Sequence, residues 1–150
     1  MKLTFKKADF TDIEFLWYLR NQPEVFKFFN NPNAIQWKEH IDWIIPIILG
    51  KAQKELFVVF LGKNPVGQIR FDWQEHKVAV ISISLLKDLW GQGIGAKILK
   101  EAIKKGKKLK VKKFIAKINQ NNIASQKLFE KFGFKFEKQL DVWKNYEKRV

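Results

Sequence analysis

Apolar residues recur along this chain with two periods, and each period indicates a different kind of element. A spacing of three or four residues predicts helices, whereas alternation or a short apolar run between turn residues predicts strands. The resulting order is β, α, α, β, β, β, α, β, α, β, β. The predicted elements are strands at 3–5, 55–61, 66–73, 78–86, 114–118 and 143–148, helices at 13–20, 35–50, from Gly93 onward and around Ala124, Leu128 and Phe132, and a return strand beginning at Phe134.

Turn and capping residues set the predicted ends of these elements. Thr11 or Asp12 is expected to cap the first helix, because a short side-chain oxygen can accept from the free N–H groups of a first turn. Proline must bend or end a helix, and glycine commonly follows one. The predicted stops are residues 21–23, Pro46, Gly106 and Gly133.

Length and composition indicate one domain over residues 1–150, since 46% of the residues are hydrophobic and can bury a single core. No apolar run reaches the roughly 18 residues of a membrane span, and the first residues lack the apolar segment of a secretion signal. We therefore expect a cytoplasmic protein that does not bind a membrane. The chain has no cysteine, and His40 and His76 stand alone, so neither thiol nor metal chemistry is predicted.

The formal net charge of +14 favours anionic partners. The densest basic segment, residues 104–113, is the best candidate for binding nucleic acid. The same segment also fits the lysine-rich end of a helix, a glycine stop and a loop into a strand. We favour this solvated-surface interpretation and predict no nucleic-acid partner, and a basic nucleic-acid-binding module remains the alternative of another class.

A glycine cluster, Trp90-Gly91-Gln92-Gly93-Ile94-Gly95, follows a strand and begins a helix. Glycine lets the backbone approach a phosphate closely, and the free N–H groups of the helix start stabilise its charge. No Gly-Lys-Ser/Thr follows, and Ala96 stands where a dinucleotide-binding fingerprint would have glycine. The cluster therefore predicts a phosphate-binding site that is neither a Gly-Lys-Ser/Thr loop nor a dinucleotide-binding fingerprint.

This loop and a second motif together resemble the GNAT N-acetyltransferase superfamily. The second motif is Asn122-Ile123-Ala124-Ser125-Gln126-Lys127-Leu128-Phe129-Glu130-Lys131-Phe132-Gly133-Phe134. The family loop reads Gln/Arg-x-x-Gly-x-Gly/Ala, and Trp90 replaces its first residue. The resemblance implies a single-domain α/β (α+β) fold. It also implies a mostly antiparallel sheet of about seven strands flanked by about four helices, with a splayed parallel strand pair that binds acetyl-CoA.

The resemblance further assigns residues to the cosubstrate, acetyl-CoA, with no metal. Backbone amides of the loop would hold the pyrophosphate, the splayed strand end would bind the pantetheine arm, and Asn122 would hydrogen-bond that arm. Helical position adds Lys97, Lys100 and Lys127 as phosphate partners. The cofactor-binding residues implied are Ile83, Leu85, Gln92, Gly93, Ile94, Gly95, Ala96, Asn122 and Lys127.

The implied reaction is direct attack of an amine on the thioester, with the amide of Leu85 polarising the carbonyl. Where the family often has a tyrosine acid, this chain has Phe129. A general base is expected on the strands that approach the site, with Asp72 and Ser84 ranked first. Glu75, His76 and Ser82 are the other candidates.

The N-terminal half supplies the expected acceptor site. His40 and Trp43 lie three residues apart on one helix, and Arg20 could clamp a diphosphate. With the segment 65–71, these residues resemble the pseudaminic-acid-pathway branch, which acetylates the 4-amino group of a UDP-linked amino-dideoxy sugar. The expected partner is such a small-molecule nucleotide-sugar, and a homodimer is possible. A ribosomal-protein N-terminus or a polyamine is the alternative acceptor.

Overall fold

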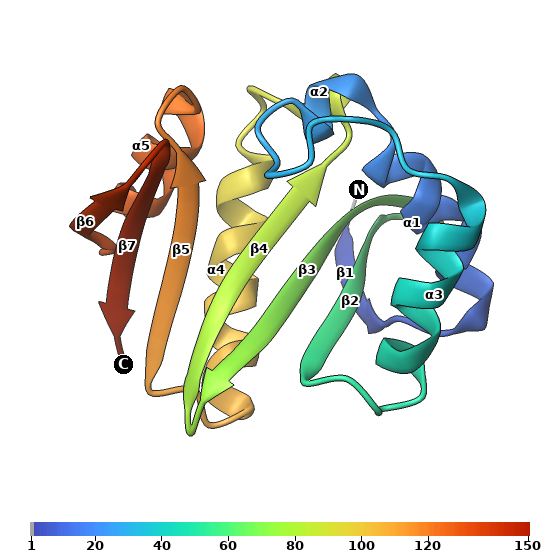
Figure 1. Cartoon of the computed structure of the whole chain (residues 1–150), viewed down its shortest axis with the longest axis horizontal. Helices are drawn as coiled ribbons and strands as arrows, with labels where there is room; N and C mark the ends of the chain where they lie inside the picture. The colour runs from blue at the N-terminus through green and yellow to red at the C-terminus, as the bar shows by residue number, and fades with distance from the viewer. Residues whose placement is uncertain (1) are drawn as a thin grey trace.

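The computed structural model describes residues 2–150, and its elements follow the predicted order (Figure 1). Five α-helices replace the four or so predicted, and seven strands are present. The strands are β1 (Leu3–Lys7), β2 (Lys54–Leu61), β3 (Asn64–Glu75), β4 (Val78–Leu85), β5 (Lys113–Asn119), β6 (Lys135–Leu140) and β7 (Trp143–Arg149). The α-helices are α1 (Ile13–Arg20), α2 (Pro23–Phe26), α3 (Trp37–Ile48), α4 (Ile94–Lys108) and α5 (Ile123–Lys131), and two short 3-10 turns are η1 (Phe10–Asp12) and η2 (Lys87–Leu89).

All seven strands form one sheet in the order β1-β2-β3-β4-β5-β7-β6. Every neighbouring pair is antiparallel except β4 and β5, which run parallel. A parallel pair needs a crossover connection, and α4 supplies it. The predicted α+β fold with a mostly antiparallel sheet and one parallel pair is therefore confirmed.

The parallel pair separates after a short stretch of contact. β4 and β5 pair only from Val78↔Lys113 to Val80↔Ile115. Beyond that point the two strands diverge toward their carboxyl ends, and α4 is visible between them in Figure 1. The last residues of β4 consequently have a strand neighbour on the β3 side alone.

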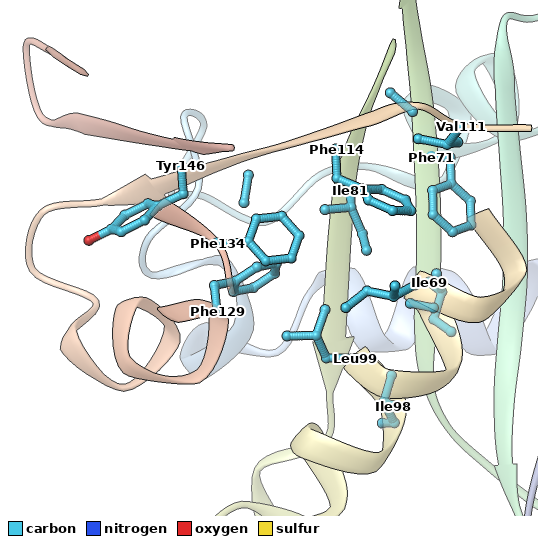
Figure 2. Close-up of a cluster of buried hydrophobic side chains, with 14 of the residues drawn as sticks. Ile69, Phe71, Ile81, Ile98, Leu99, Val111, Phe114, Phe129, Phe134 and Tyr146 are labelled. Carbon is cyan, nitrogen blue, oxygen red and sulfur yellow. The ribbon is translucent and has the colours of Figure 1, made fainter. Parts of the chain in front are cut away.

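Helices cover both faces of the sheet and bury two apolar clusters. On one face α4 and α5 pack against the central strands, and the aromatic residues of this cluster meet edge to face or tilted (Figure 2). On the other face α1 and α3 cover β2. Each large side chain buried in this way contributes about 1.5–3 kcal/mol. The residues labelled in Figure 2 are Ile69, Phe71, Ile81, Ile98, Leu99, Val111, Phe114, Phe129, Phe134 and Tyr146.

The helical segment after β1 begins earlier than predicted. Asp9, rather than Thr11 or Asp12, is the capping residue: its Oδ1 accepts from the Thr11 N–H at 2.8 Å. Asp12 completes a reciprocal capping box by accepting from the Asp9 N–H at 2.9 Å. The cap belongs to η1, which leads directly into α1.

The predicted stop at residues 21–23 is confirmed, because α1 ends at Arg20 with Asn21 as its C-cap. Pro23 also occupies the first position of α2, where its missing N–H costs nothing. Pro46 lies inside α3, which continues for two more residues to Ile48. The Pro46 carbonyl then accepts from the Lys51 N–H at 2.8 Å, which helps to close the helix end.

Gly106 is not a helix stop. It is buried inside α4, where a methyl group would overlap the ring of Phe114. The residue with left-handed backbone after this helix is Lys110, at φ 70°. Gly106 therefore serves packing between helix and sheet, a role that spacing alone did not distinguish from a stop.

The buried side of α5 also differs from the predicted stripe. Leu128 and Phe132 pack against the core as expected, whereas Ala124 is exposed. Gln126 and Phe129 are the buried residues of this helix. The amide of Gln126 is satisfied there, since its Nε2 donates to the Gln120 carbonyl at 3.0 Å.

Candidate active site

The glycine loop forms a cradle of backbone donors at the start of α4. Gly91 and Gly93 have φ of 75° and 78°, and Gly93 is the N-cap of the helix. Within the described chain, no backbone or side-chain acceptor takes the N–H groups of residues 91–96. Open donors at a helix N-terminus stabilise an anion, so the structure fits the predicted pyrophosphate site.

The carboxyl end of β4 exposes backbone groups beside this loop. The Leu86 N–H donates to the Val66 carbonyl at 2.9 Å, so it points toward β3. Successive N–H groups of a strand point to opposite edges, and the Leu85 N–H therefore faces the gap left by β5. The Ile83 N–H, two residues earlier, faces the same way. Both residues have the orientation that the pantetheine and oxyanion roles require.

Gly67 is a site residue that the sequence reasoning missed. It pairs with Leu85 across β3 and β4, and a methyl group at Gly67 would overlap the Ser84 carbonyl oxygen. Glycine is thus needed for β3 to approach the end of β4 so closely. A lone glycine inside an otherwise regular strand was the available signal.

Trp90 reaches back to the same strand end. Its indole Nε1 donates to the Leu85 carbonyl oxygen at 2.9 Å. Gln92 makes a second internal bond of the loop, from its Nε2 to the Asp88 carbonyl at 2.9 Å. The side chains of the loop therefore hold it in shape while its backbone donors stay open.

Asn122 lies at the start of α5, where its Oδ1 accepts from the Ser125 N–H at 3.2 Å. No described residue accepts from its Nδ2 group, which keeps the donor needed for a cofactor arm. Lys97, Lys100 and Lys127 are exposed on α4 and α5. Their role as phosphate partners stays a prediction.

The structure does not bring the two favoured base candidates together. Ser84 lies at the end of β4 and is nearly buried, opposite Gln68. Asp72 lies opposite Val80, which precedes Ser84 by four residues, and four residues correspond to about 13 Å along a strand. Its carboxylate is also engaged by Arg70 Nε at 2.9 Å and Lys54 Nζ at 3.2 Å. Asp72 thus cannot contact an amine that sits at Leu85.

Glu75 and His76 lie at the β3–β4 turn, at the opposite end of β4 from the glycine loop. They line a surface hollow there with Trp73 and Lys110, and a second hollow is lined by Gly133 and by residues of β6 and β7. The expectation that Glu75 and His76 approach the site was wrong. Ser82 lies opposite Arg70, two residues before Ser84 and on the same face of the sheet.

Arg20 is already committed to the protein. Its Nη1 and Nη2 donate to the carbonyls of Asn33 and Asn31 at 3.1 and 3.0 Å. The guanidinium also lies 4.9 Å from the ring centre of Phe29. In this state the side chain holds the segment before α3, rather than presenting open donors to a diphosphate.

His40 and Trp43 are neighbours on α3, with ring centres 6.2 Å apart. His40 is only 1% exposed, and its Nε2 donates to the Ile13 carbonyl at 2.9 Å. No described residue forms a hydrogen bond with its Nδ1. His40 therefore lies in the core beside the predicted acceptor site, and only Trp43 of this pair is partly exposed.

Burial of His40 gives a pH prediction. Desolvation lowers the pKa of His40 below 6.5, against the opposing hydrogen bond to Ile13 and with help from nearby Arg20. The unfolded chain therefore binds the proton more readily, and the free energy of unfolding should fall as pH drops below about 6.5. Urea denaturation at pH 7.5 and 5.5 measures this. His40→Gln, which keeps a donor for Ile13, should lose the fall over this window; an unchanged fall would contradict the assignment.

Arg70 is a further residue that the sequence reasoning did not assign to the site. Its guanidinium lies 5.4 Å from the ring centre of Trp43, and its Nε bonds to Asp72. No described residue accepts from its two Nη groups. Alternation along β3 puts Arg70 on the same face as Ser82. That period-two pattern in residues 65–71 was the signal available in the sequence.

The position matched to the family tyrosine is part of the core. Phe129 is 3% exposed, and its ring packs edge to face on Phe134 at 4.9 Å. Tyr146 does not replace the missing hydroxyl, because its Oη bonds to Gln126 Oε1 at 3.4 Å and burial raises the pKa of Tyr146. The chain offers no tyrosine acid from these two positions.

Residues 2–150 contain neither a metal-ligand cluster nor a membrane-spanning helix. No group of three or more His, Cys, Asp or Glu side chains is arranged to hold a metal ion. None of the helices over the same residues has the length and apolar character to cross a bilayer.

The sequence of residues 2–135 matches the family described as acetyltransferase (GNAT) domain. A curated relative, an uncharacterised protein of Methanocaldococcus jannaschii, is 31% identical over 142 residues, which cover 89% of this chain. The match spans only 28% of that relative's own length.

Solved structures share the fold over almost the whole chain. A domain from Methanocaldococcus jannaschii has a TM-score of 0.87 and 28% identity, with 99% of both chains covered. A spermidine N-acetyltransferase from Vibrio cholerae, in complex with CoA and spermine, has a TM-score of 0.85 and 18% identity, with 98% of this chain and 95% of that chain covered.

Proposed function

Because the chain belongs to the GNAT acetyltransferase domain family, we propose that it uses acetyl-CoA to acetylate the 4-amino group of a UDP-linked amino-dideoxy sugar. One observation supports the acetyl-transfer part of this proposal. The strand end with the open Leu85 N–H lies directly before a loop whose N–H groups are also open. A thioester carbonyl and a pyrophosphate of one molecule need these two kinds of donor.

The residues fit acetyl-CoA in three places. Backbone N–H groups of residues 92–96 would hold the pyrophosphate, the edge groups of Ile83 would pair with the pantetheine arm, and the Leu85 N–H would meet the thioester at the end of that arm. Asn122 Nδ2 would donate to that arm, and Lys97, Lys100 and Lys127 would add positive charge near the phosphates. Bound acetyl-CoA supplies the activated acetyl group.

The chain contributes position and polarisation to the transfer. The Leu85 N–H would donate to the carbonyl oxygen where negative charge develops. Ser84 would hydrogen-bond the attacking amine or the water that takes its proton. With Phe129 in the core, water is the group available to protonate the departing thiolate. No covalent intermediate with the protein is required.

The acceptor part rests on Arg70 and Trp43. Arg70 presents two free Nη groups beside the Trp43 ring, on the face of the sheet that carries Ser82 and Ser84. A guanidinium fork suits a diphosphate, and an aromatic ring suits a base or sugar. This pair takes over the role predicted for Arg20 and His40. A net charge of +14 also favours an anionic acceptor over a polyamine.

Thiol release from acetyl-CoA, measured against three acceptors, tests the proposal. The acceptors are a UDP-linked 4-amino-4,6-dideoxy sugar, spermidine, and a peptide with a ribosomal-protein N-terminus. The sugar nucleotide should give the highest kcat/KM. Activity on the peptide or spermidine alone would reject the sugar acceptor and keep the acetyltransferase. Absence of acetyl-CoA binding would reject both.

Arg70→Ala should raise KM for the sugar nucleotide about tenfold or more, because a charge-assisted contact to a phosphate is lost. The Kd for acetyl-CoA should stay within about twofold by calorimetric titration. Lys54→Ala is the matched control, since it removes the other cation on Asp72 and leaves the stacking of Arg70 on Trp43 in place. An equal rise of KM in both variants would point to Asp72 rather than to a phosphate contact.

A further inference from the structure

The Leu85 carbonyl has an unusual partner for a strand residue. The edge of β4 that faces β5 has no strand neighbour after Val80. At Leu85 the missing partner is replaced by the indole of Trp90, whose Nε1 donates to the carbonyl oxygen at 2.9 Å. Trp90 is 48% exposed, so burial in the core does not explain the placement of this ring.

The bond fixes one peptide group from both sides. The peptide between Leu85 and Leu86 donates through the Leu86 N–H to Val66 and accepts through the Leu85 oxygen from Trp90. A peptide held at both ends cannot rotate about its flanking dihedrals without losing a hydrogen bond. The adjacent peptide carries the Leu85 N–H, whose direction is therefore set by the same pair of bonds.

We infer that Trp90 is a positioning residue for the Leu85 amide. Its indole N–H takes the place of the absent β5 strand, and it thereby aims the Leu85 N–H at the carbonyl to be polarised. This inference rests on the proposed function, because it assumes that acetyl-CoA lies along β4. It gives a side-chain role to the position where Trp replaces the Gln or Arg of the family loop.

The experiment removes only the hydrogen-bond donor. Site-specific incorporation of 3-benzothienylalanine at Trp90 replaces the indole N–H by sulfur and keeps the size of the ring. Infrared spectra of bound acetyl-CoA labelled with carbon-13 in the acetyl carbonyl report its polarisation directly. The native protein should lower the carbonyl stretching frequency relative to free acetyl-CoA, and the substituted protein should lower it less. Turnover with the best acceptor should fall about tenfold, with the Kd for acetyl-CoA within about twofold.

Trp37→Phe serves as the control, because Trp37 is also a largely exposed tryptophan and lies on α3, away from the glycine loop. It should leave the carbonyl frequency unchanged. A substituted protein with the native frequency shift would overturn the inference. So would tighter binding of acetyl-CoA, which would show that the indole competes with the pantetheine arm. If the native protein binds no acetyl-CoA, the proposed function fails instead.

Discussion

Gly93→Val is expected to reduce the affinity for acetyl-CoA by about 100-fold or more. Gly93 has a φ of 78°, and valine is strongly disfavoured in that conformation. Relaxation of the strain would turn the first N–H groups of α4 away from the phosphates. The Cβ would also project into open space, where the anion is expected to lie. Calorimetric titration with acetyl-CoA measures the loss.

Gly50→Val provides the control for backbone strain alone. Gly50 follows α3 with a φ of 72°, and its Cβ would also meet nothing within 4 Å. Both variants should lose about 1–3 kcal/mol of stability, but only the change at Gly93 should weaken acetyl-CoA binding. Normal affinity in Gly93→Val would contradict the assignment of the loop.

Gly67→Ala is expected to lower kcat about 100-fold, because the added methyl group must displace the Ser84 carbonyl and with it the end of β4. A shift of about 1 Å at a reacting centre has an effect of this size. The pyrophosphate cradle is untouched, so the Kd for acetyl-CoA should rise much less. Steady-state kinetics and calorimetric titration separate the two effects.

Gly106→Ala is the matched variant for overpacking. Its methyl group would collide with the Phe114 ring in the core, away from the end of β4. Both substitutions should destabilise the protein by about 1–3 kcal/mol, measured by thermal melting. If Gly106→Ala lowers kcat as much as Gly67→Ala, general loss of stability explains the effect and the close approach at Ser84 does not.

The sheet and its order were predictable because the pattern of apolar residues was strong. β5 and most of β3 and β4 bury alternate residues, which leaves a period of two in the sequence, whereas β2 is one apolar run because Val58 and Val59 are buried on opposite faces of the sheet. The two motifs then placed the loop and α5. The prediction failed where one residue type has several uses. Gly106 was interpreted as a helix stop, but it is small because Phe114 packs against it.

The acceptor side was less predictable for a physical reason. Arg20, His40 and Trp43 were grouped by their chemistry, and the structure does bring Arg20 close enough to influence the pKa of His40. Composition cannot show, however, that the donors of Arg20 are used by the carbonyls of Asn31 and Asn33. Arg70, which keeps free donors, was visible only as one alternating position in a strand.

The early separation of β4 from β5 leaves one edge of the β4 end without a strand neighbour, between the two faces of the sheet. The glycine loop leads into α4 on one side, whereas Trp43 and Arg70 lie on the other. If acetyl-CoA and the acceptor bind as proposed, they reach Leu85 from opposite faces of the sheet and need not pass one another. Neither would then have to leave before the other binds, so the architecture favours a complex that holds donor and acceptor at once.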